Sequence, residues 1–346
     1  MRLFVNNYGG GNYLSEDGGR TWVNASTGYS GASVDFLFVD PSNAQNLLCG
    51  AASGLFESTD RGQTWEGLAY QPARATNITA LAVDPSDPDH IISRPWDIVA
   101  LPVSYDGGTT WERIPIRDAH EHLVTALAFA PSNSDTVYAG RGMRGCDERR
   151  EESCPAGGGI DVSHDSGLTW SEVDDPLVRD KHVVVLAVHP EDSRTVFAGT
   201  LYHGAYLSSD GGDTWESLAL GLSSVLALAI DPEDPQVIYA GGCGGINRSD
   251  DGGATWIWTS GGLEPETIVR AIQIDPSREA VWCGDFRGVH ISYTQGDRWE
   301  NVNDGLTTDN VTSLALAADG TAMYAGTSGQ GVFRLDLAPP EGQQRW

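Results

Sequence analysis

The sequence predicts an all-β fold, a single β-propeller of four-stranded antiparallel blades, and two observations support this prediction. The first is a short motif, S-x-D-x-G-x-T-W, which occurs seven times in 346 residues, the last time in degraded form. The second is a series of short apolar runs at the same period, each ended by turn residues. A repeat of this length with one aromatic motif per unit is typical of a propeller. The motifs begin at Ser15, Ser58, Ser104, Ser163, Ser208, Ser249 and Ser292.

Each repeat predicts four strands, named A to D from the inside of the ring outwards. Strand A is an apolar run such as 78–83, and it ends in a turn that contains Pro. Strand B follows, for example at 196–199, and strand C leads into the motif, as at 204–208. Strand D is expected to start at the Thr-Trp pair of the motif, because β-branched and aromatic residues suit a half-buried strand.

The Asp of the motif is predicted to have a structural role. Its carboxylate can accept hydrogen bonds from the backbone N–H groups that follow, and a Gly two residues later permits the positive φ of a tight turn. The Trp buries a large apolar area between neighbouring sheets. The six carboxylates concerned are Asp17, Asp60, Asp106, Asp165, Asp210 and Asp251.

The number of blades is predicted to be seven, with eight as the alternative. The N-terminus supplies strands B, C and D, six repeats are complete, and the C-terminus supplies strands A, B and C, which makes thirty strands. We expect the two ends to share a closing blade, which would remove the open sheet edge. The domain is expected to span residues 1–338, followed by a frayed tail at 339–346.

The motif resembles the Asp-box, or BNR repeat, of sialidases, xyloglucanases, the sortilin luminal domain and the photosystem II assembly factor family. The resemblance covers nearly the whole chain and implies a propeller whose boxes lie on hairpins away from the ligand face. It implies little about function, because Asp-box propellers host many functions. The arginine motif of sialidases is not in place, since Arg113-Ile114-Pro115 follows the third box. Sialidase activity is therefore not expected.

The composition indicates a strongly acidic protein. The formal net charge is −27, with 48 acidic and 21 basic residues, and Lys181 is the only lysine. A dispersed acidic surface with almost no lysine suggests adaptation to high salt, and it argues against nucleic-acid binding. The chain contains no run of apolar residues long enough to span a membrane and no signal peptide at Met1, so a cytoplasmic, monomeric protein is expected.

Ligand-binding residues are expected on the face opposite the boxes, where the loops from strand B to C and from strand D to the next strand A lie. The aromatic, arginine and acidic residues of these loops form the candidate set. Two repeats independently place an acid and an Arg in the same B–C loop, which gives those residues the highest rank. The candidates are Arg94, Trp96, Asp97, Arg141, Arg144, Tyr202, His203, Asp285 and Arg287.

Two functions remain open from the sequence. The first is a non-enzymatic binding or assembly scaffold that holds a protein or carbohydrate partner on this loop face. The alternative is a glycoside hydrolase that uses a pair of loop carboxylates, with Asp97 and Asp285 as candidates. No cofactor or metal is expected. Cys146 and Cys154 bracket the longest insert and form either a local disulfide or two free thiols.

Overall fold

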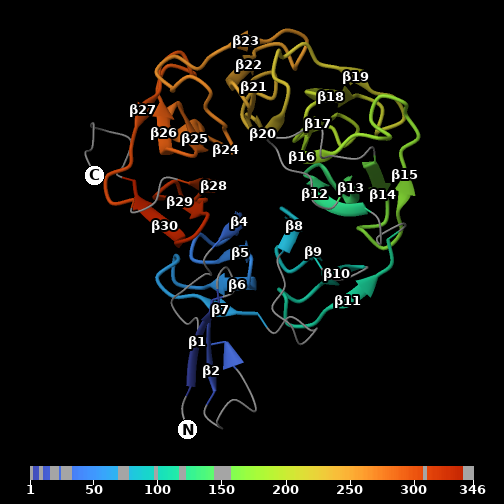
Figure 1. The fold of residues 1–346 in the computed structure, drawn as a ribbon. Helices are drawn as coiled ribbons and strands as arrows, with labels where there is room; N and C mark the ends of the chain where they lie inside the picture. The colour runs from blue at the N-terminus through green and yellow to red at the C-terminus, as the bar shows by residue number, and fades with distance from the viewer. Residues whose placement is uncertain are drawn as a thin grey trace.

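The computed structural model describes residues 33–68, 78–96, 100–116, 122–143, 157–306 and 310–337, together with the backbone of strands at 3–7, 11–15 and 23–24. Seven antiparallel sheets form a ring around a central channel (Figure 1). We number them blades 1 to 7 in chain order; six have four strands and blade 7 has three. The predicted seven-bladed propeller is therefore confirmed.

The strands occupy the same four positions in each blade. Position A, at the channel, is taken by β4 (Val34–Val39), β8 (Ile78–Val83), β12 (His122–Ala130), β16 (Val183–Val188), β20 (Val225–Ile230), β24 (Ala271–Asp275) and β28 (Val311–Leu316). Position B is taken by β5 (Leu47–Ala51), β9 (Ile91–Pro95), β13 (Asn133–Met143), β17 (Val196–Thr200), β21 (Ile238–Gly242), β25 (Ala280–Asp285) and β29 (Ala322–Thr327).

The two outer positions complete the blades. Position C is taken by β6 (Gly54–Ser58), β10 (Leu101–Ser104), β14 (Gly159–Ser163), β18 (Ala205–Ser208), β22 (Gly245–Ser249), β26 (Gly288–Ser292) and β30 (Gly331–Asp336). Position D, which blade 7 lacks among the described residues, is taken by β7 (Glu66–Gly67), β11 (Glu112–Ile114), β15 (Ser171–Glu172), β19 (Glu216–Ser217), β23 (Ile257–Trp258) and β27 (Glu300–Asn301). The D strands begin one residue after the box Trp, so the prediction that they start at the Thr-Trp pair was wrong.

The ring closes where blade 7 packs against blade 1. Thr312 Oγ1 of β28 donates to the carbonyl of Val34 in β4, and Tyr324 Oη of β29 donates to the carbonyl of Arg61, 3.2 Å away. The N-terminal strands β1 (Leu3–Asn7), β2 (Gly11–Ser15) and β3 (Val23–Asn24) pair only with one another and lie outside the ring (Figure 1). The two ends therefore do not share a closing blade. The physical reason is that both ends supply strands of types B and C, and one blade has room for only one of each.

The boxes tie the C–D turns as expected from their sequence. In blade 4, the backbone N–H of Thr214 donates to Asp210 Oδ1 over 2.9 Å, and Thr214 Oγ1 donates to Oδ2 over 2.6 Å. The hydrogen bonds from Thr214 lower the pKa of Asp210 to about 2. Asp60, Asp106, Asp165 and Asp251 accept the same two bonds, while Asp17 lies outside the described residues.

The core lies between neighbouring blades. Trp215 of blade 4 is 6% exposed and packs in one cluster with Ile160 and Val173 of blade 3 and with Val196 and Ala198 of its own blade. The blades also approach each other closely at the channel side, where a Cβ on Gly199 would be 2.7 Å from the carbonyl oxygen of Val225 in the next blade. This contact lets the inner strands of adjacent blades approach each other closely.

Candidate functional site

The inner strands share an irregularity that directs one residue of each blade toward the channel. In six blades the pairing of strands A and B skips one residue of strand A, which is the pattern of a β-bulge; it is the second residue of the strand in five blades and the fourth residue of β12 in blade 3. In blade 6 the matching residue directly precedes β24. The seven residues are Asp35, Thr79, Thr125, Val184, Leu226, Arg270 and Thr312.

The three threonines of this set connect neighbouring blades by hydrogen bonds. Thr79 Oγ1 lies 2.9 Å from the carbonyl oxygen of Arg94 in its own blade and 3.1 Å from that of Val124 in blade 3. Thr125 and Thr312 donate in the same way to carbonyls of their own and the following blade. Their role is therefore structural.

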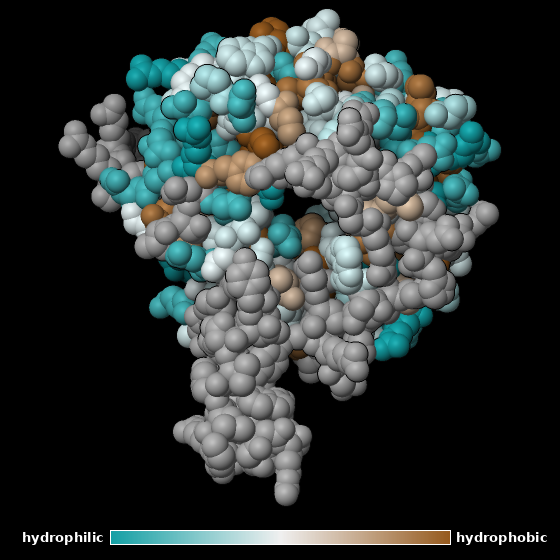
Figure 2. Space-filling model, in the orientation of Figure 1, coloured by the Kyte–Doolittle hydropathy of each residue, from teal (hydrophilic) through white to brown (hydrophobic). Residues whose placement is uncertain are grey.

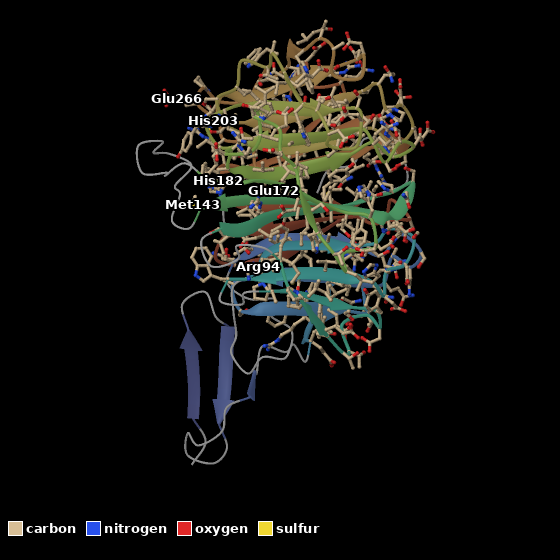
Figure 3. The ribbon with its side chains drawn as sticks, turned by 90° about the vertical axis from the view of Figure 1, so that its right-hand side faces the viewer. Arg94, Met143, Glu172, His182, His203 and Glu266 are labelled. Carbon is tan, nitrogen blue, oxygen red and sulfur yellow. The ribbon has the colours of Figure 1, made fainter. Side chains whose placement is uncertain are left out.

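The other four bulge residues line a cavity in the channel, together with Thr312. The cavity has a volume of about 300 Å³, and its remaining walls come from the two residues His182 and Leu201. Figure 2 shows a hollow at the centre of the ring. His182 directly precedes β16 and Leu201 directly follows β17. The cavity therefore opens toward the B–C and D–A loops, where ligand-binding residues are expected. Figure 3 shows His182 along one side of the disc with Met143, His203 and Glu266.

A carboxylate and a guanidinium lie in this cavity. Burial raises the pKa of Asp35, and the positive charge of Arg270 acts in the opposite direction. The Arg270 guanidinium carbon also lies 4.5 Å from the centroid of the Phe286 ring, a cation–π contact that fixes its orientation. The cavity therefore combines a charged guanidinium with a carboxyl group whose protonated form is favoured by burial.

His182 adds a neutral imidazole. Burial lowers its pKa to about 4, so the ring carries no charge at neutral pH. Its Nδ1 is buried and has no hydrogen-bond partner among the described residues. With Val184, Leu201 and Leu226 as apolar walls, the cavity can hold one polar group by hydrogen bonds and pack the carbon atoms beside it.

Among the candidates in blade 2, Arg94 does not lie in the B–C loop where it was expected. Arg94 lies inside β9 and is fully buried, with Nη1 donating to the Pro95 carbonyl over 2.9 Å. It occupies the register position at which the other six blades have Gly, so the B–C loop does not present it. Trp96 follows β9 and is 39% exposed. Asp97 lies outside the described residues.

The candidates in blades 3 and 4 divide into buried and exposed residues. Arg141 is buried in β13 and forms ion pairs with Asp161 (Nε–Oδ2, 3.2 Å) and Glu172 (Nη2–Oε1, 2.8 Å). Figure 3 shows Arg94 and Glu172 further inside the disc than His203. Tyr202 adopts a left-handed φ of 68°, and its N–H donates to Ser224 Oγ over 3.1 Å. His203 is exposed beside it, whereas Arg144 lies outside the described residues.

Asp285 is 1% exposed at the end of β25, and its oxygens are occupied. Thr267 Oγ1 donates to Oδ2, Arg287 N donates to Oδ1 over 2.7 Å, and His290 Nε2 lies 3.2 Å from Oδ1. Burial alone would raise the pKa of Asp285, but these hydrogen bonds outweigh it and hold the pKa below its usual value. Arg287 is 60% exposed and its Nη1 lies 3.9 Å from Glu264 Oε2.

Asp35 and Arg270 were not among the candidates, and His182 belongs to a D–A loop of the expected ligand face but was not ranked among them. A charged residue inside an apolar inner strand was the available signal, as in Val34-Asp35-Phe36 and Val269-Arg270-Ala271. The bulge could not be read from the sequence, because strict alternation would place these side chains between the blades. Within the described residues, no group of three His, Cys, Asp or Glu side chains could hold a metal ion. No helix in the same part of the chain is long and apolar enough to cross a membrane.

A family model for sortilin (Sortilin-Vps10, "Sortilin, neurotensin receptor 3") matches residues 99–225. No curated protein matches the sequence. Among solved structures, an ancestral GH74 enzyme superposes with a TM-score of 0.71 at 19% identity, and the match covers 96% of this chain and 46% of that one. This chain therefore spans less than half of that enzyme.

Two further structures are of similar length to this chain. YCF48 bound to D1 peptide matches with a TM-score of 0.64 at 15% identity, covering 89% of this chain and 92% of that one. YCF48 from Cyanidioschyzon merolae matches with a TM-score of 0.63 at 15% identity, covering 90% and 97%. The family match over residues 99–225 agrees with the predicted resemblance to Asp-box repeats, and at these identities the solved structures show a common propeller fold.

Proposed function

We propose that this chain is a binding module that holds a segment of a protein partner on its loop face, with one polar group of that segment in the channel cavity. The observation that carries the proposal is the cavity itself. It combines the guanidinium of Arg270, the carboxyl of Asp35 and the imidazole of His182 with the apolar walls of Val184 and Leu226. Such a mixed wall suits a peptide, whose amides and side chains alternate polar and apolar groups.

The similarity to YCF48 adds support, because that protein is of comparable length and has been solved with a bound peptide. The similarity to a GH74 enzyme favours the second function, that of a glycoside hydrolase. Hydrolysis of that kind needs two carboxyl groups about 5–9.5 Å apart, one of them with a raised pKa. Asp35 is the only carboxylate among the described residues that line the cavity, and Asp285 has a lowered pKa. The cavity therefore supports binding better than hydrolysis.

The test is selection of peptides from a random displayed library on the wild-type protein, followed by affinity measurements with two variants. Arg270→Gln removes the cavity cation and is expected to weaken the selected peptides at least tenfold, since a charge-assisted contact is lost. Arg298→Gln is the matched control, because that exposed side chain lies in a box turn on the opposite face and does not line the cavity. Both variants are first compared with the wild type in unfolding temperature.

Two results would contradict the proposal. One is equal affinity of the selected peptides for all three proteins. The other is hydrolysis of polysaccharides such as xyloglucan by the wild type that is abolished in Asp35→Asn. The second result would establish the hydrolase.

A further inference from the structure

The channel cavity has a polar side and an apolar side, which follow from the order of the blades. Arg270 comes from blade 6 and Asp35 from blade 1, and only blade 7 lies between these two blades. Val184 of blade 4 and Leu226 of blade 5 occupy the same repeat position further round the ring. A group that enters the cavity therefore meets a guanidinium and a carboxyl on one side and aliphatic side chains on the other.

The polar side can serve a ligand that both donates and accepts hydrogen bonds. No hydrogen bond within the described residues engages the Asp35 carboxyl. Thr312, which lies between the two ionisable side chains in the ring, uses its hydroxyl on the carbonyls of Val34 and Gly326. A ligand atom that excludes water here must accept a bond from Arg270 and must also pair with Asp35. A hydroxyl meets both needs, because it donates to a carboxylate and accepts from a protonated carboxyl.

His182 and Leu201 lie nearer the loop face than the bulge residues do. His182 directly precedes β16, whose second residue is Val184, and Leu201 directly follows β17. The His182 ring is uncharged at neutral pH, since burial lowers its pKa to about 4. A neutral imidazole and an aliphatic side chain at the entrance can pack the carbon atoms of a side chain that reaches down to the bulge residues.

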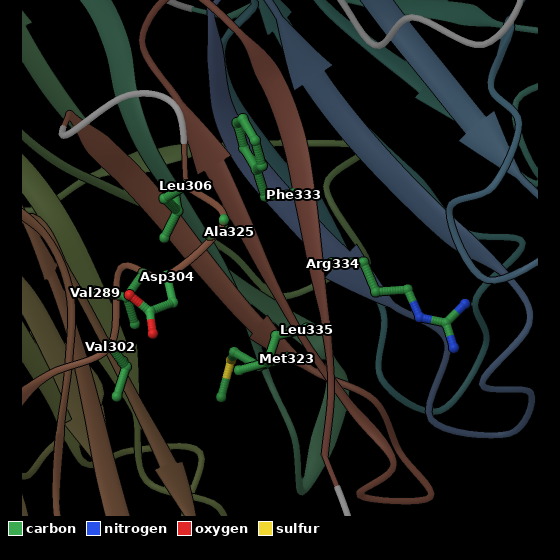
Figure 4. Close-up of a pocket in the computed structure, with 10 residues that line it drawn as sticks. Val289, Val302, Asp304, Leu306, Met323, Ala325, Phe333, Arg334 and Leu335 are labelled. Carbon is green, nitrogen blue, oxygen red and sulfur yellow. The ribbon is translucent and has the colours of Figure 1, made fainter. Parts of the chain in front are cut away.

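A second cavity, between blades 6 and 7, is smaller and has mainly apolar walls (Figure 4). Its volume is about 110 Å³, against about 300 Å³ for the channel cavity. Its ionisable lining residues are Asp304 and Arg334, and Figure 4 shows Arg334 directed away from Met323 and Leu335. The share of one water molecule in the liquid is about 30 Å³. The channel cavity is therefore the better place for a large side chain that has a polar end.

Tyrosine matches the walls of the channel cavity better than the other side chains. Its phenolic oxygen donates and accepts, and its ring supplies a flat apolar body. The indole N–H of tryptophan only donates, and phenylalanine leaves both polar groups unpaired. Lysine is repelled by Arg270, glutamate brings a second carboxyl beside Asp35, and asparagine is too short to cover the aliphatic walls.

We propose that the group that enters the channel cavity is a tyrosine side chain of the partner segment, with its hydroxyl between Arg270 and Asp35. Its ring packs against the aliphatic side chains on the other side of the channel. This inference rests on the proposed function, because it names the residue by which a bound segment is recognised.

The first experiment measures, by ligand-observed NMR, the binding of p-cresol, which carries the side chain of tyrosine, and of toluene, which carries that of phenylalanine. Asp35→Leu replaces the carboxyl by an aliphatic group of similar shape. Arg298→Gln is the matched control, because that exposed side chain lies in a box turn on the opposite face. The wild type and the control should bind p-cresol at least about tenfold more tightly than toluene, and Asp35→Leu should lose this preference while it still binds toluene.

A ratio of two affinities in the same protein separates a lost hydrogen bond from a general loss of stability, which would weaken both ligands. Arg270→Gln provides a second variant with the same expectation, a smaller preference for p-cresol. Unfolding temperatures of all variants are compared with the wild type first.

The second experiment uses the peptides selected on the wild-type protein. Replacement of their tyrosine by phenylalanine should weaken binding at least about tenfold in the wild type and have a smaller effect in Asp35→Leu, since the partner of the hydroxyl is then absent. The control Arg298→Gln should respond as the wild type does.

Equal affinities of the wild type for p-cresol and toluene would overturn the inference. Selected peptides that depend on Arg270 but contain no tyrosine, or that tolerate phenylalanine in its place, would overturn it and leave the proposed function intact. A preference for p-cresol that is lost in Asp35→Leu, with a library that yields no peptide, would support the phenol site and contradict the proposed function instead.

Discussion

A single bulged residue in each blade decides what the channel can do. Where the residue is Thr, its hydroxyl forms hydrogen bonds with backbone carbonyls of two neighbouring blades, as Thr79 does. Where it is Asp35 or Arg270, the side chain brings an ionisable group into the cavity. The same position in the repeat therefore either links neighbouring blades or lines the cavity, depending on the side chain.

His182 gives this site a measurable dependence on pH. Its folded-state pKa is about 4, below the usual value of 6.5, so between these values the unfolded chain binds a proton that the folded chain does not. The stabilising contribution of the neutral ring is complete above pH 6.5 and is lost as the pH falls toward 4. We expect the free energy of unfolding to fall, between pH 7 and pH 4.5, by on the order of 2 kcal/mol more in the wild type than in His182→Gln, measured by urea denaturation.

The exposed residue His203, on the same loop face, provides the control for this measurement. His203→Gln should show the same loss as the wild type. The box carboxylates add their own loss as the pH falls below about 4, since their folded-state pKa values are lowered, but that loss is common to all three proteins. An identical pH dependence in His182→Gln and the wild type would show that burial does not perturb this histidine.

At the scale of strands, the bulge couples neighbouring blades through hydroxyl groups. Thr312→Val keeps the shape of the side chain and removes its bond to the Val34 carbonyl, at the junction of blades 7 and 1. We expect a loss of about 1–2 kcal/mol in the free energy of unfolding, because a carbonyl in the interior loses its donor. Denaturant titration of the purified variant measures it.

The reciprocal substitution is Val184→Thr, which places a hydroxyl at the matching position of blade 4. At this position the carbonyls of Gly199 and Val225 correspond to those of Gly326 and Val34 at the junction of blades 7 and 1. We expect stability equal to or slightly above that of the wild type. A loss as large as that of Thr312→Val would show that the hydroxyl is not what holds these strands together.

The sequence was informative about strands A to C because their residues are determined by local chemistry and by burial. The apolar run 78–83 and the strand β8 coincide, since alternating contacts with two neighbouring blades require a continuous apolar run. The D strands were placed one residue early because the box Trp belongs to the turn, where Trp215 Nε1 donates to the Gly212 carbonyl. The loop face could be assigned from the order of strands alone.

The candidate residues were less predictable for a reason that lies in the same strands. Arg94 lies one residue before the end of β9 and Arg141 two residues before the end of β13. Long side chains find buried partners there, as Arg141 does in Asp161. Asp35 reaches the channel because the backbone bulges, and Arg270 takes the matching position directly before β24; a bulge has no distinct residue pattern in this repeat. Loop composition thus selected the face on which the cavity opens, but it gave no high rank to the residues that line this cavity.

At the scale of the whole molecule, the net charge of −27 is expected to make stability depend on salt. Exposed carboxylates repel one another over a distance set by the Debye length, about 10 Å at 0.1 M and about 3 Å at 1 M ionic strength. The ion pairs that oppose this repulsion are few in the described residues, and several, such as Arg298 with Glu300, are mostly exposed. Added salt should therefore screen more repulsion than attraction.

We expect the unfolding temperature to rise by several degrees between 0.05 M and 1 M KCl, with most of the increase at the low end, where the Debye length changes most. NaCl should act equally if screening is the cause, and a neutral osmolyte at equal osmolality should not reproduce the curve. A variant in which exposed D-strand carboxylates such as Glu66, Glu112 and Glu216 are changed to Gln, with the box carboxylates kept, should show a smaller rise. An unfolding temperature that is constant or falls with KCl would mean that the acidic surface does not limit stability, and the expectation of adaptation to high salt would be lost with it.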